Sequence, residues 1–440
     1  MIHSKLKKMV FALGILISPI YLQAQENSVL KLSVSELFDL VKKNHPTLKV
    51  SEADVQIAEQ NINVAKNQFL PEISTGLQGY YLGDAHIIDK DFSNSSRVDM
   101  PNFGNKFSVE ARQLIWKGGV VKNAVEIQNL KKDLSQLNYE SNELNIKLLS
   151  AGYYLDLFKL YNQEKVYHKN IELAQERLDN INKFYKQGMV TSKDDIRGEL
   201  QLSNLKLALQ VVQNNQSILN KQLTVALGLD EGVKIIPDES IVTESLEILP
   251  LASYYGDLVN HPTIKQTEKA VDIYAVSEKI SRSDMMPSLS AFAGNTLQRP
   301  ITTSNPAMDM YTNGWSAGLS LNFNIDALFK APKKIQLNRL EKEKAIRQSN
   351  EVSEMMKVAV NAAYIKYNEA LTQNNTLKVN KDLTAENYRI MESKYNNQLA
   401  ILLDLIDASN AKLDAELQFA NSEINIVFAY YKLLKEAGTL

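Results

Sequence analysis

Few residues of this 440-residue sequence are spaced for catalysis. Gly314-Trp315-Ser316-Ala317-Gly318 matches the letters of a hydrolase nucleophile elbow, but it lies inside a run of alternating residues and not at a strand-to-helix turn. The sequence contains neither G-x-x-x-x-G-K-[ST] nor H-E-x-x-H. A catalytic Ser316 is therefore a minor alternative, and we expect that the protein is not an enzyme.

Candidate metal ligands are equally sparse. His45 and His261 each stand next to a proline that suits the first turn of a helix, so a structural role is more probable for them than metal ligation. Met285-Met286, and Met308 with Met310, are thioethers without cysteine or histidine nearby, which makes a soft-metal site a weak alternative. We expect no metal and no cofactor.

The informative charges are carboxylates near the starts of two predicted helices. Asp404 and Asp407 are spaced i, i+3 and therefore share one helical face, and Asp194 lies 210 residues before Asp404. In a monomer these acids would simply favour the positive end of a helix. If several chains closed around an axis, the same acids would form carboxylate rings that attract cations and control passage.

A repeated signature organises the chain around these residues. Asn44-His45-Pro46-Thr47 recurs as Asn260-His261-Pro262-Thr263, 216 residues later. At the same offset Pro71 corresponds to Pro287, and each proline ends a polar helical run and opens a Gly/Ser-rich run of alternating pattern. A period this long is not that of a solenoid repeat, so we interpret the chain as a tandem duplication of a half-molecule.

Each copy contains a pair of predicted strands, within residues 71–117 and 287–325. Their residues alternate between apolar and polar, as in Trp315 to Phe323, so each strand has one apolar and one polar face. The stretches Asp89 to Asn105 and Gln298 to Asn313 are loop-like in composition. Four strands alone leave two open edges, and apolar-out, polar-in strands of about ten residues are typical of an outer-membrane barrel. A two-hairpin cap on a soluble helical protein remains an alternative.

Long helices follow each strand pair. Gly119 to about Lys186 and about Pro332 to Asn396 contain almost no Gly or Pro, and such a run of about 67 residues spans roughly 100 Å as a helix. Heptad spacing of apolar residues, from Ile171 to Tyr185 in the first outgoing helix and from Leu413 to Leu434 in the second return helix, predicts coiled-coil packing. The turns between outgoing and return helices fall near 187–192 and 396–401, so each half ends in a long helical hairpin.

The predicted organisation is therefore a first repeat over residues 25–228, a linker over 229–250 and a second repeat over 251–440. Ser33-Val34-Ser35-Glu36 matches a capping box and predicts a short helix that ends near Lys43.

The N-terminus indicates export. Residues 1–24 combine a basic start, a short apolar core and a plausible small-residue cleavage site, so we expect a cleaved signal peptide, with an uncleaved anchor helix as the alternative. No later apolar stretch has the length of a spanning helix, so strands must carry any membrane insertion. The chain has no cysteine, which excludes disulfides, and its formal charge of −2 gives no reason to expect nucleic acid as a partner.

Taken in order, these motifs resemble those of the TolC-like outer membrane efflux protein family. The resemblance covers the whole predicted mature chain. It rests on the paired Asn-His-Pro starts, on the strand-to-helix turn that ends in Gly118-Gly119, and on Tyr185-Lys186-Gln187-Gly188 followed by Asp194. It also rests on Tyr395 followed by Leu403-Asp404-Leu405-Ile406-Asp407-Ala408.

The resemblance implies a homotrimer with an α+β membrane fold, in which each chain gives four strands to a shared outer-membrane barrel that long helices continue as a periplasmic coiled-coil tube. Lipid would surround the barrel, and a periplasmic adaptor (membrane fusion) protein and an inner-membrane RND or ABC transporter would be the partners. The implied function is the exit duct of a tripartite efflux pump or type I secretion system. Asp404 and Asp407 match the family's ring of acids at the periplasmic entrance, and Asp194 and Tyr395 match members of the network that holds the tips closed.

Two positions depart from the family pattern: Gln398 replaces an expected glycine, and Ala400 replaces a basic gate residue of some members. The alternative function is that of a periplasmic coiled-coil scaffold or adaptor without a pore. Neither the exported substrate nor the cognate pump can be read from the chain.

Overall fold

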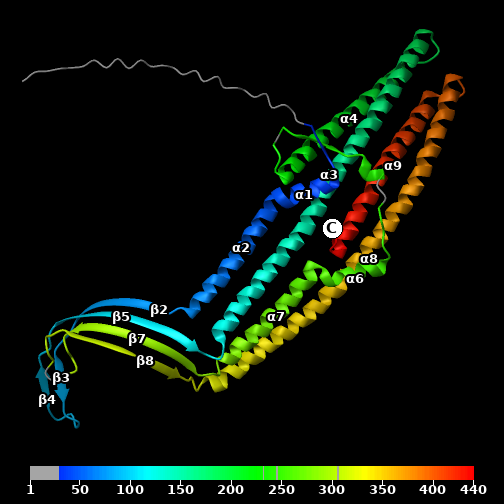
Figure 1. The fold of residues 1–440 in the computed structure, drawn as a ribbon. Coiled ribbons are helices and arrows are strands. Elements are labelled where there is room, and N and C mark those ends of the chain that lie inside the picture. The colour runs from blue at the N-terminus through cyan, green and yellow to red at the C-terminus, as the bar shows by residue number, and fades with distance from the viewer. Residues whose placement is uncertain (1–28, 231, 244–245, 305–306) are drawn as a thin grey trace, which may run out of the picture.

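The computed structural model describes residues 29–230, 232–243, 246–304 and 307–440. In this part of the chain a curved four-stranded sheet is continued by a long bundle of helices (Figure 1). The predicted signal peptide at residues 1–24 lies outside the described residues. Among the helices that are described, none is both long and apolar enough to cross a membrane.

Each half of the chain begins with a short strand and short helices, continues through the strands of the sheet and ends in a long helical hairpin. The first half contains β1 (Val29–Leu32), α1 (Val34–Asn44), α2 (Pro46–Lys66), η1 (Asn67–Phe69), β2 (Glu72–Tyr81), β3 (Ala85–Ile88), β4 (Ser95–Val98), β5 (Phe103–Trp116), α3 (Val120–Lys186) and α4 (Ser192–Leu227). The second contains β6 (Lys234–Pro237), α5 (Ser240–Thr243), α6 (Leu251–Asp257), η2 (Leu258–Asn260), α7 (Pro262–Ser283), β7 (Ser288–Arg299), β8 (Thr312–Asn322), α8 (Ala327–Asn396) and α9 (Leu402–Ala437).

The two outgoing helices are unusually long. Helices α3 and α8 contain 67 and 70 residues, so each spans roughly 100 Å. The start of α3 agrees with the sequence, but α8 begins at Ala327, before the predicted start near Pro332. A proline this close to the helix start removes only one backbone hydrogen bond, to the Leu328 carbonyl, so the helix continues through it.

The main sheet has the order β2-β5-β7-β8, and every neighbouring pair is antiparallel. Leu77 pairs with Phe107, and Phe107 pairs with Leu297, so apolar residues of neighbouring strands lie on the same face. The predicted alternation of apolar and polar faces is confirmed.

One predicted loop was wrong. Residues 85–98, part of which lies in the stretch Asp89 to Asn105, form the antiparallel hairpin β3–β4, whose turn is closed by a 3.0 Å hydrogen bond from the Asp89 N–H to the Asn94 carbonyl. The hairpin extends beyond the far end of the main sheet (Figure 1). Its strands have four residues each, too few for alternation to stand out in the sequence.

The predicted linker at 229–250 also contains more structure than expected. Strand β6 pairs in parallel with β1, with Leu30 opposite Ile235. The buried Tyr154 of α3 stabilises the pairing of β1 with β6. Its hydroxyl donates to the Leu32 carbonyl at 2.6 Å and accepts from the Asp238 N–H at 2.9 Å. The segment is therefore packed against the helices at mid-length and forms part of the main apolar core.

The strand-to-helix turn needs glycine. Gly118 and Gly119 have φ values of 54° and 76°, in the left-handed region that other residues avoid. A side chain at Gly118 would also collide with Met286 and with the backbone of Ser283. The Ser283 hydroxyl donates to the Gly118 carbonyl at 2.8 Å, so α7 supports the point where β5 becomes α3.

Candidate functional site

The turns that end the two helical hairpins lie at the end of the molecule farthest from the sheet (Figure 1). The α3–α4 turn, called tip one (residues 187–191), and the α8–α9 turn, called tip two (residues 397–401), have the same backbone form. Gly188 in tip one has φ 72° and Gln398 in tip two has φ 59°. Gln398 therefore adopts the conformation of the expected glycine, at the steric cost of a left-handed residue with a Cβ atom.

Tip one is closed by a capping box at the start of α4. The Asp194 carboxylate accepts hydrogen bonds from the Thr191 N–H at 3.1 Å and from the Thr191 hydroxyl at 2.9 Å. Both bonds end on the same oxygen, Oδ2. Asp194 is thus engaged within its own turn, where its negative charge also suits the positive end of the helix.

Tip two has no such box, because Ile401 occupies the corresponding N-cap position and cannot accept a hydrogen bond. Asp404 and Asp407 are both exposed, while Leu402 and Leu405 are buried on the opposite side of the same turn. Within the described residues, neither carboxylate has a hydrogen bond or an ion pair that would neutralise it. Both acids therefore face outward from the hairpin with their charge free.

Tyr395 lies at the end of α8, between the two tips. The residue is 8 % exposed, and its hydroxyl has no hydrogen-bond partner in the described part of the chain. Burial raises the pKa of the Tyr395 phenol and the nearby Asp194 carboxylate raises it further, so the phenol is neutral at physiological pH. No hydrogen bond joins Tyr395 to Asp194 within one chain.

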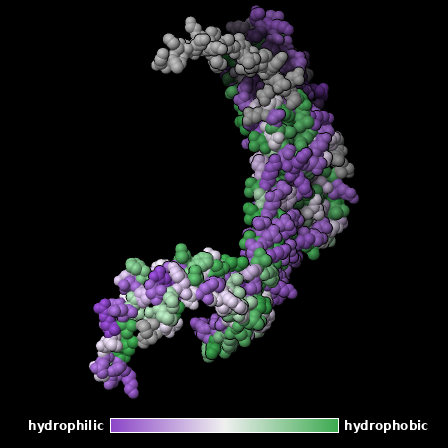
Figure 2. Space-filling view, turned by 60° about the vertical axis from the view of Figure 1, so that its left-hand side comes forward, coloured by the Kyte–Doolittle hydropathy of each residue, from purple (hydrophilic) through white to green (hydrophobic). Residues whose placement is uncertain are grey.

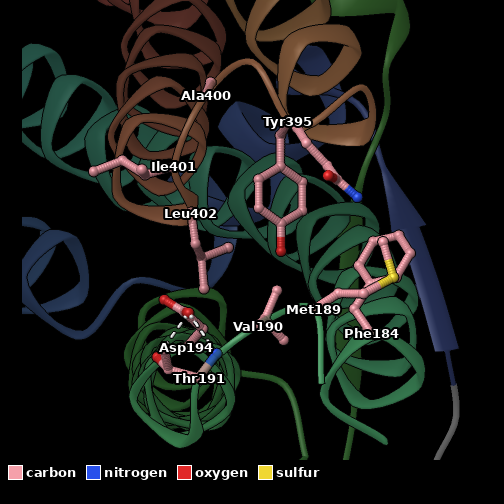
Figure 3. Close-up of a pocket in the computed structure, with 10 residues that line it drawn as sticks. Phe184, Met189, Val190, Thr191, Asp194, Tyr395, Ala400, Ile401 and Leu402 are labelled. Carbon is pink, nitrogen blue, oxygen red and sulfur yellow. Dashed lines mark hydrogen bonds between the residues drawn. The ribbon is translucent and has the colours of Figure 1, made fainter. Parts of the chain in front are cut away.

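The Tyr395 hydroxyl points toward Val190 and Leu402 in a cavity of about 280 Å³ between the tips (Figure 3). The two hairpins supply the lining together. The residues that line it are Phe184, Met189, Val190, Thr191, Asp194, Tyr395, Gln398, Ala400, Ile401 and Leu402. Asp194 and Tyr395, which the family resemblance assigns to the same network at the tips, thus line one cavity.

A buried arginine next to this cavity was missed from the sequence. Arg177 of α3 is 8 % exposed and donates to Gln201 of α4 at 2.9 Å, to the Tyr388 hydroxyl of α8 at 3.1 Å and to the Ser409 hydroxyl of α9 at 3.2 Å. Tyr388 in turn donates to Glu392 at 2.6 Å. Arg177 therefore connects all four helices of the two hairpins.

A signal for this arginine is present in the sequence. Ile171, Ala174, Leu178 and Ile181 form an apolar heptad seam, and Arg177 lies three residues after Ala174, at an inward-facing position. A charged residue at such a position needs polar partners from the facing helices. The sequence does not identify those partners, since they lie up to 232 residues away.

The repeated Asn-His-Pro signature is structural in both copies. Pro46 and Pro262 begin α2 and α7, and the Nδ1 atoms of His45 and His261 accept the N–H groups of the threonines two residues on, at 3.2 and 3.1 Å. Nδ1 is therefore occupied as a helix cap. In the described residues no three His, Cys, Asp or Glu side chains gather as a metal site.

The same signature also contacts the C-terminal end of the return helix of each hairpin. The Asn44 amide donates to the Leu227 carbonyl at 2.9 Å, at the C-terminal end of α4, where Gly228 leaves room for it. In the second half His261 packs against Gly438, at the end of α9, and burial lowers the pKa of its imidazole. Asn260, the last residue of η2, precedes this contact.

Two other predicted residues are explained by the strands. Pro71 and Pro287 each stand directly before a strand of the main sheet, where a missing N–H is tolerated.

Ser316 lies in the middle of β8 opposite Gly294, not at a turn into a helix. The nucleophile-elbow alternative was wrong.

Comparison with known proteins agrees with this architecture. The family model described as outer membrane efflux protein matches residues 37–229 and 254–439. The outer membrane efflux protein BepC of Brucella suis is 20 % identical over 404 residues, which cover 90 % of this chain and 83 % of BepC.

Solved structures show the same fold at low sequence identity. VceC of Vibrio cholerae, an outer membrane protein, is 14 % identical with a TM-score of 0.72, over 92 % of this chain and 96 % of that one. The CmeC outer membrane channel of Campylobacter jejuni is 16 % identical with a TM-score of 0.71, over 94 % and 86 % of the two chains. The chain belongs to the outer membrane efflux protein family, a family of outer-membrane transport channels, not enzymes, that work with periplasmic adaptors and inner-membrane pumps.

Proposed function

We propose that this protein is the passive exit duct of a tripartite efflux pump or type I secretion system, through which small molecules or proteins leave the cell. Three copies close around one axis, their strands form a shared barrel in the outer membrane and their helices form a tube in the periplasm. An adaptor docks on the tube, and an RND or ABC transporter of the inner membrane supplies the energy. The surface of the main sheet is the observation that carries this proposal.

One face of that sheet is apolar and open to its surroundings. Leu77 and Trp315 are each 80 % exposed, and other large apolar residues on the same face are 36–79 % exposed. The large exposed apolar residues of this face are Ile73, Leu77, Tyr81, Phe103, Phe107, Leu297, Trp315, Leu319 and Leu321. Apolar surface is visible over this end of the molecule in Figure 2. A contiguous apolar surface of this kind suits contact with lipid.

The opposite face is polar and carries glycines. Gly76, Gly104, Gly294, Gly314 and Gly318 all alternate onto it. An added Cβ at Gly318 would lie 3.0 Å from the ring of Phe292, so side chains on this face are already close together. Small residues are needed on the concave side of a tightly curved sheet, which favours this face as the lining of a lumen.

The edges of the sheet support closure with other copies. Among the described residues, β2 and β8 each pair with one neighbouring strand, so each has a row of backbone groups without partners in the described sheet. Such groups are costly to leave unpaired in a membrane. Pairing of β8 with β2 of the next copy would satisfy both rows and leave no edge.

The outer edges of the helical bundle also carry unpaired apolar seams. On α2, Val50, Ile57 and Val64 are exposed at heptad spacing. The exposed apolar residues of α4 are Ile196, Leu200, Leu207, Val211, Ile218 and Val225, and those of α8 include Leu337, Leu340, Met355, Val358, Ile365, Val379, Leu383 and Ile390. In a trimer these seams would pack against one another and close the tube.

The proposed gate lies at the tips. Asp404 and Asp407 have the exposure and free charge required of a cation-attracting ring at the periplasmic entrance. Asp194 and Tyr395 line the cavity between the tips, and a hydroxyl that is unpartnered within one chain is suited to bond across copies and hold the tips closed. Arg177 would keep the two hairpins of each chain together as they move.

We further propose that the chain arose by tandem duplication, with repeats at 25–228 and 251–440 and the segment 229–250 between them. The repeated order of helix, strand pair and long hairpin supports this, as does the family match to two separate segments.

A pair of substitutions on β2 tests the proposed function. Leu77→Glu places a charge on the apolar face, whereas the control Gln78→Glu places the same charge one residue along, on the polar face. We expect Leu77→Glu to reduce the amount of trimer recovered from the outer membrane severalfold, because a charge on the lipid face destabilises a barrel, by up to about 2–4 kcal/mol for Lys or Arg and by less for Glu. Gln78→Glu should leave the recovery unchanged.

Single-channel recording of the purified protein in a planar bilayer completes this test. Small, cation-selective openings from a trimer would support the duct. Equal membrane recovery of the two variants, or a soluble monomer, would contradict it, and a trimer that never conducts would favour a scaffold without a pore.

A further inference from the structure

The cavity between the tips has the character of a ligand site. Most of its wall is apolar, with Phe184, Met189 and Val190 from the first hairpin and Ile401 and Leu402 from the second (Figure 3). Its volume of about 280 Å³ is nearly twice the roughly 150 Å³ of an engineered apolar cavity that accepts benzene. A molecule of about ten to twelve non-hydrogen atoms therefore fits.

Two polar groups in this wall retain binding capacity. The Tyr395 hydroxyl is buried and has no partner among the described residues, although a buried hydroxyl without a hydrogen bond is costly. The Asp194 carboxylate receives both of its capping bonds on Oδ2, so Oδ1 is available. The Tyr395 hydroxyl can accept or donate a hydrogen bond, and the Asp194 carboxylate provides a negative charge at the edge of an apolar space.

We propose that this cavity binds a small lipophilic amine. Its ammonium would lie on Asp194 and donate a hydrogen bond to the Tyr395 hydroxyl, and its apolar body would lie between Phe184, Met189 and Ile401. A neutral or anionic ligand would leave the Asp194 charge uncompensated as water is displaced. Charge complementarity therefore selects a cation, and the wall selects one with an aromatic or aliphatic body.

Ligand binding should bias the relative position of the hairpins. The ligand contacts both tips at once, so it stabilises the arrangement in which the cavity exists. This consequence rests on the proposed gate: a bound amine would hold the tips in the closed arrangement and reduce conductance. Binding itself does not depend on a pore.

The binding test uses 1-naphthylmethylamine as the probe and its neutral analogue 1-naphthylmethanol as the reference. Both are titrated against the full-length protein in detergent, where a Kd on the order of 1 mM or tighter is expected for the amine. We expect Asp194→Asn to weaken the amine about tenfold and the alcohol hardly at all, and Tyr395→Phe to weaken both about threefold. Leu399→Ala is the matched control, since Leu399 is 78 % exposed at tip two and does not line the cavity.

Equal amine affinity in wild type, Asp194→Asn and Tyr395→Phe would overturn the site, because the probe would then be in the micelle or elsewhere on the protein. Absence of saturable binding would also overturn it and leave the cavity to a side chain of a partner protein.

The gating consequence is tested separately by adding the amine to an open channel in a planar bilayer. A fall in open probability with added amine, whose midpoint concentration is about threefold higher in Tyr395→Phe than in wild type, would support it. Unchanged conductance despite confirmed binding would contradict the coupling but not the site, and a protein that binds the amine but never conducts would refute the proposed duct instead.

Discussion

The two helical tips of this protein have the same backbone but use it differently. In tip one a glycine takes the left-handed position, and Thr191 and Asp194 form a capping box. In tip two Gln398 takes the left-handed position, Ile401 replaces the capping threonine, and Asp404 has no partner in the described residues. Asp194 and Asp404 occupy corresponding positions in their helices, the third residue after the N-cap.

This difference shows how one repeated turn can serve two purposes. A carboxylate that accepts two hydrogen bonds from its own N-cap on one oxygen stabilises its helix and keeps the other oxygen available for a ligand. A carboxylate without that cap leaves the helix start weaker and keeps its charge available. Tip one is therefore the more stable of the two, and tip two carries the free acids and a strained turn.

The largest expected effect concerns the hydrogen bonds of Arg177, which join the two helical hairpins below their tips. Arg177→Met keeps most of the aliphatic length but leaves Gln201, Tyr388 and Ser409 without their donor, and we expect a local destabilisation of about 3 kcal/mol. Hydrogen exchange at the backbone amides of α4 and α9 measures it. Arg389→Met is the control, because Arg389 is exposed and, in the described part of the chain, pairs only with Glu386 three residues away. Similar exchange in both variants would show that Arg177 does not couple the hairpins.

The next effect tests the free acids of tip two. Asp404→Asn with Asp407→Asn should lower the cation-to-anion permeability ratio severalfold and weaken block by multivalent cations, since both carboxylates are exposed and unpaired in the described structure. Bilayer recording measures both quantities. Asp382→Asn removes an exposed acid on the same hairpin roughly 20 Å from the tip and should change neither. Unchanged selectivity in the double variant would exclude an acidic ring.

A reciprocal exchange of the caps tests the comparison directly. Thr191→Val should destabilise the start of α4 by about 1 kcal/mol, and Ile401→Thr should stabilise the start of α9 by a similar amount, because it creates a box with Asp404. Ile401 is 62 % exposed, so little packing is lost. Hydrogen exchange in the first turn of each helix reports the change. If Ile401→Thr leaves the α9 amides as they were, the tips differ for a reason other than capping.

The smallest expected effect concerns the left-handed residues. Gln398→Gly should stabilise tip two by about 0.5–1 kcal/mol, because relief of the left-handed strain exceeds the added chain entropy, and Gly188→Gln should cost tip one a similar amount. Susceptibility to proteolysis at each turn provides the measurement. Equal cleavage of wild type and Gln398→Gly would show that the strain at Gln398 is already relieved.

Much of the tip could be anticipated from the sequence because its chemistry is local. The correspondence of Asp194 with Asp404 follows from their 210-residue offset in the repeated chain, and the i, i+3 spacing of Asp404 and Asp407 requires only the period of a helix. The capping box at Ser33 and Glu36 was predicted and is confirmed, with the Glu36 carboxylate 2.9 Å from the Ser33 N–H. The box at Thr191 was not predicted, although the same spacing was present.

Predictions failed where short segments depend on distant partners. Strand β6 exists because it pairs with β1, about 200 residues earlier in the chain, and four residues give no period of their own. Arg177 was overlooked for the same reason, because its hydrogen-bond partners belong to three other helices.

The sequence by itself determined the elements that neighbouring residues encode: the two strand faces, the long helices and the proline starts, since these depend on periods of two and 3.6 residues and on turn chemistry. Only the tertiary structure decided which side chains meet. It placed Arg177 against Tyr388 and brought Tyr395 and Asp194 to one cavity, because those contacts join residues about 200 apart in the chain. No local pattern specifies a contact between helices that distant, so packing of the two hairpins had to be known first.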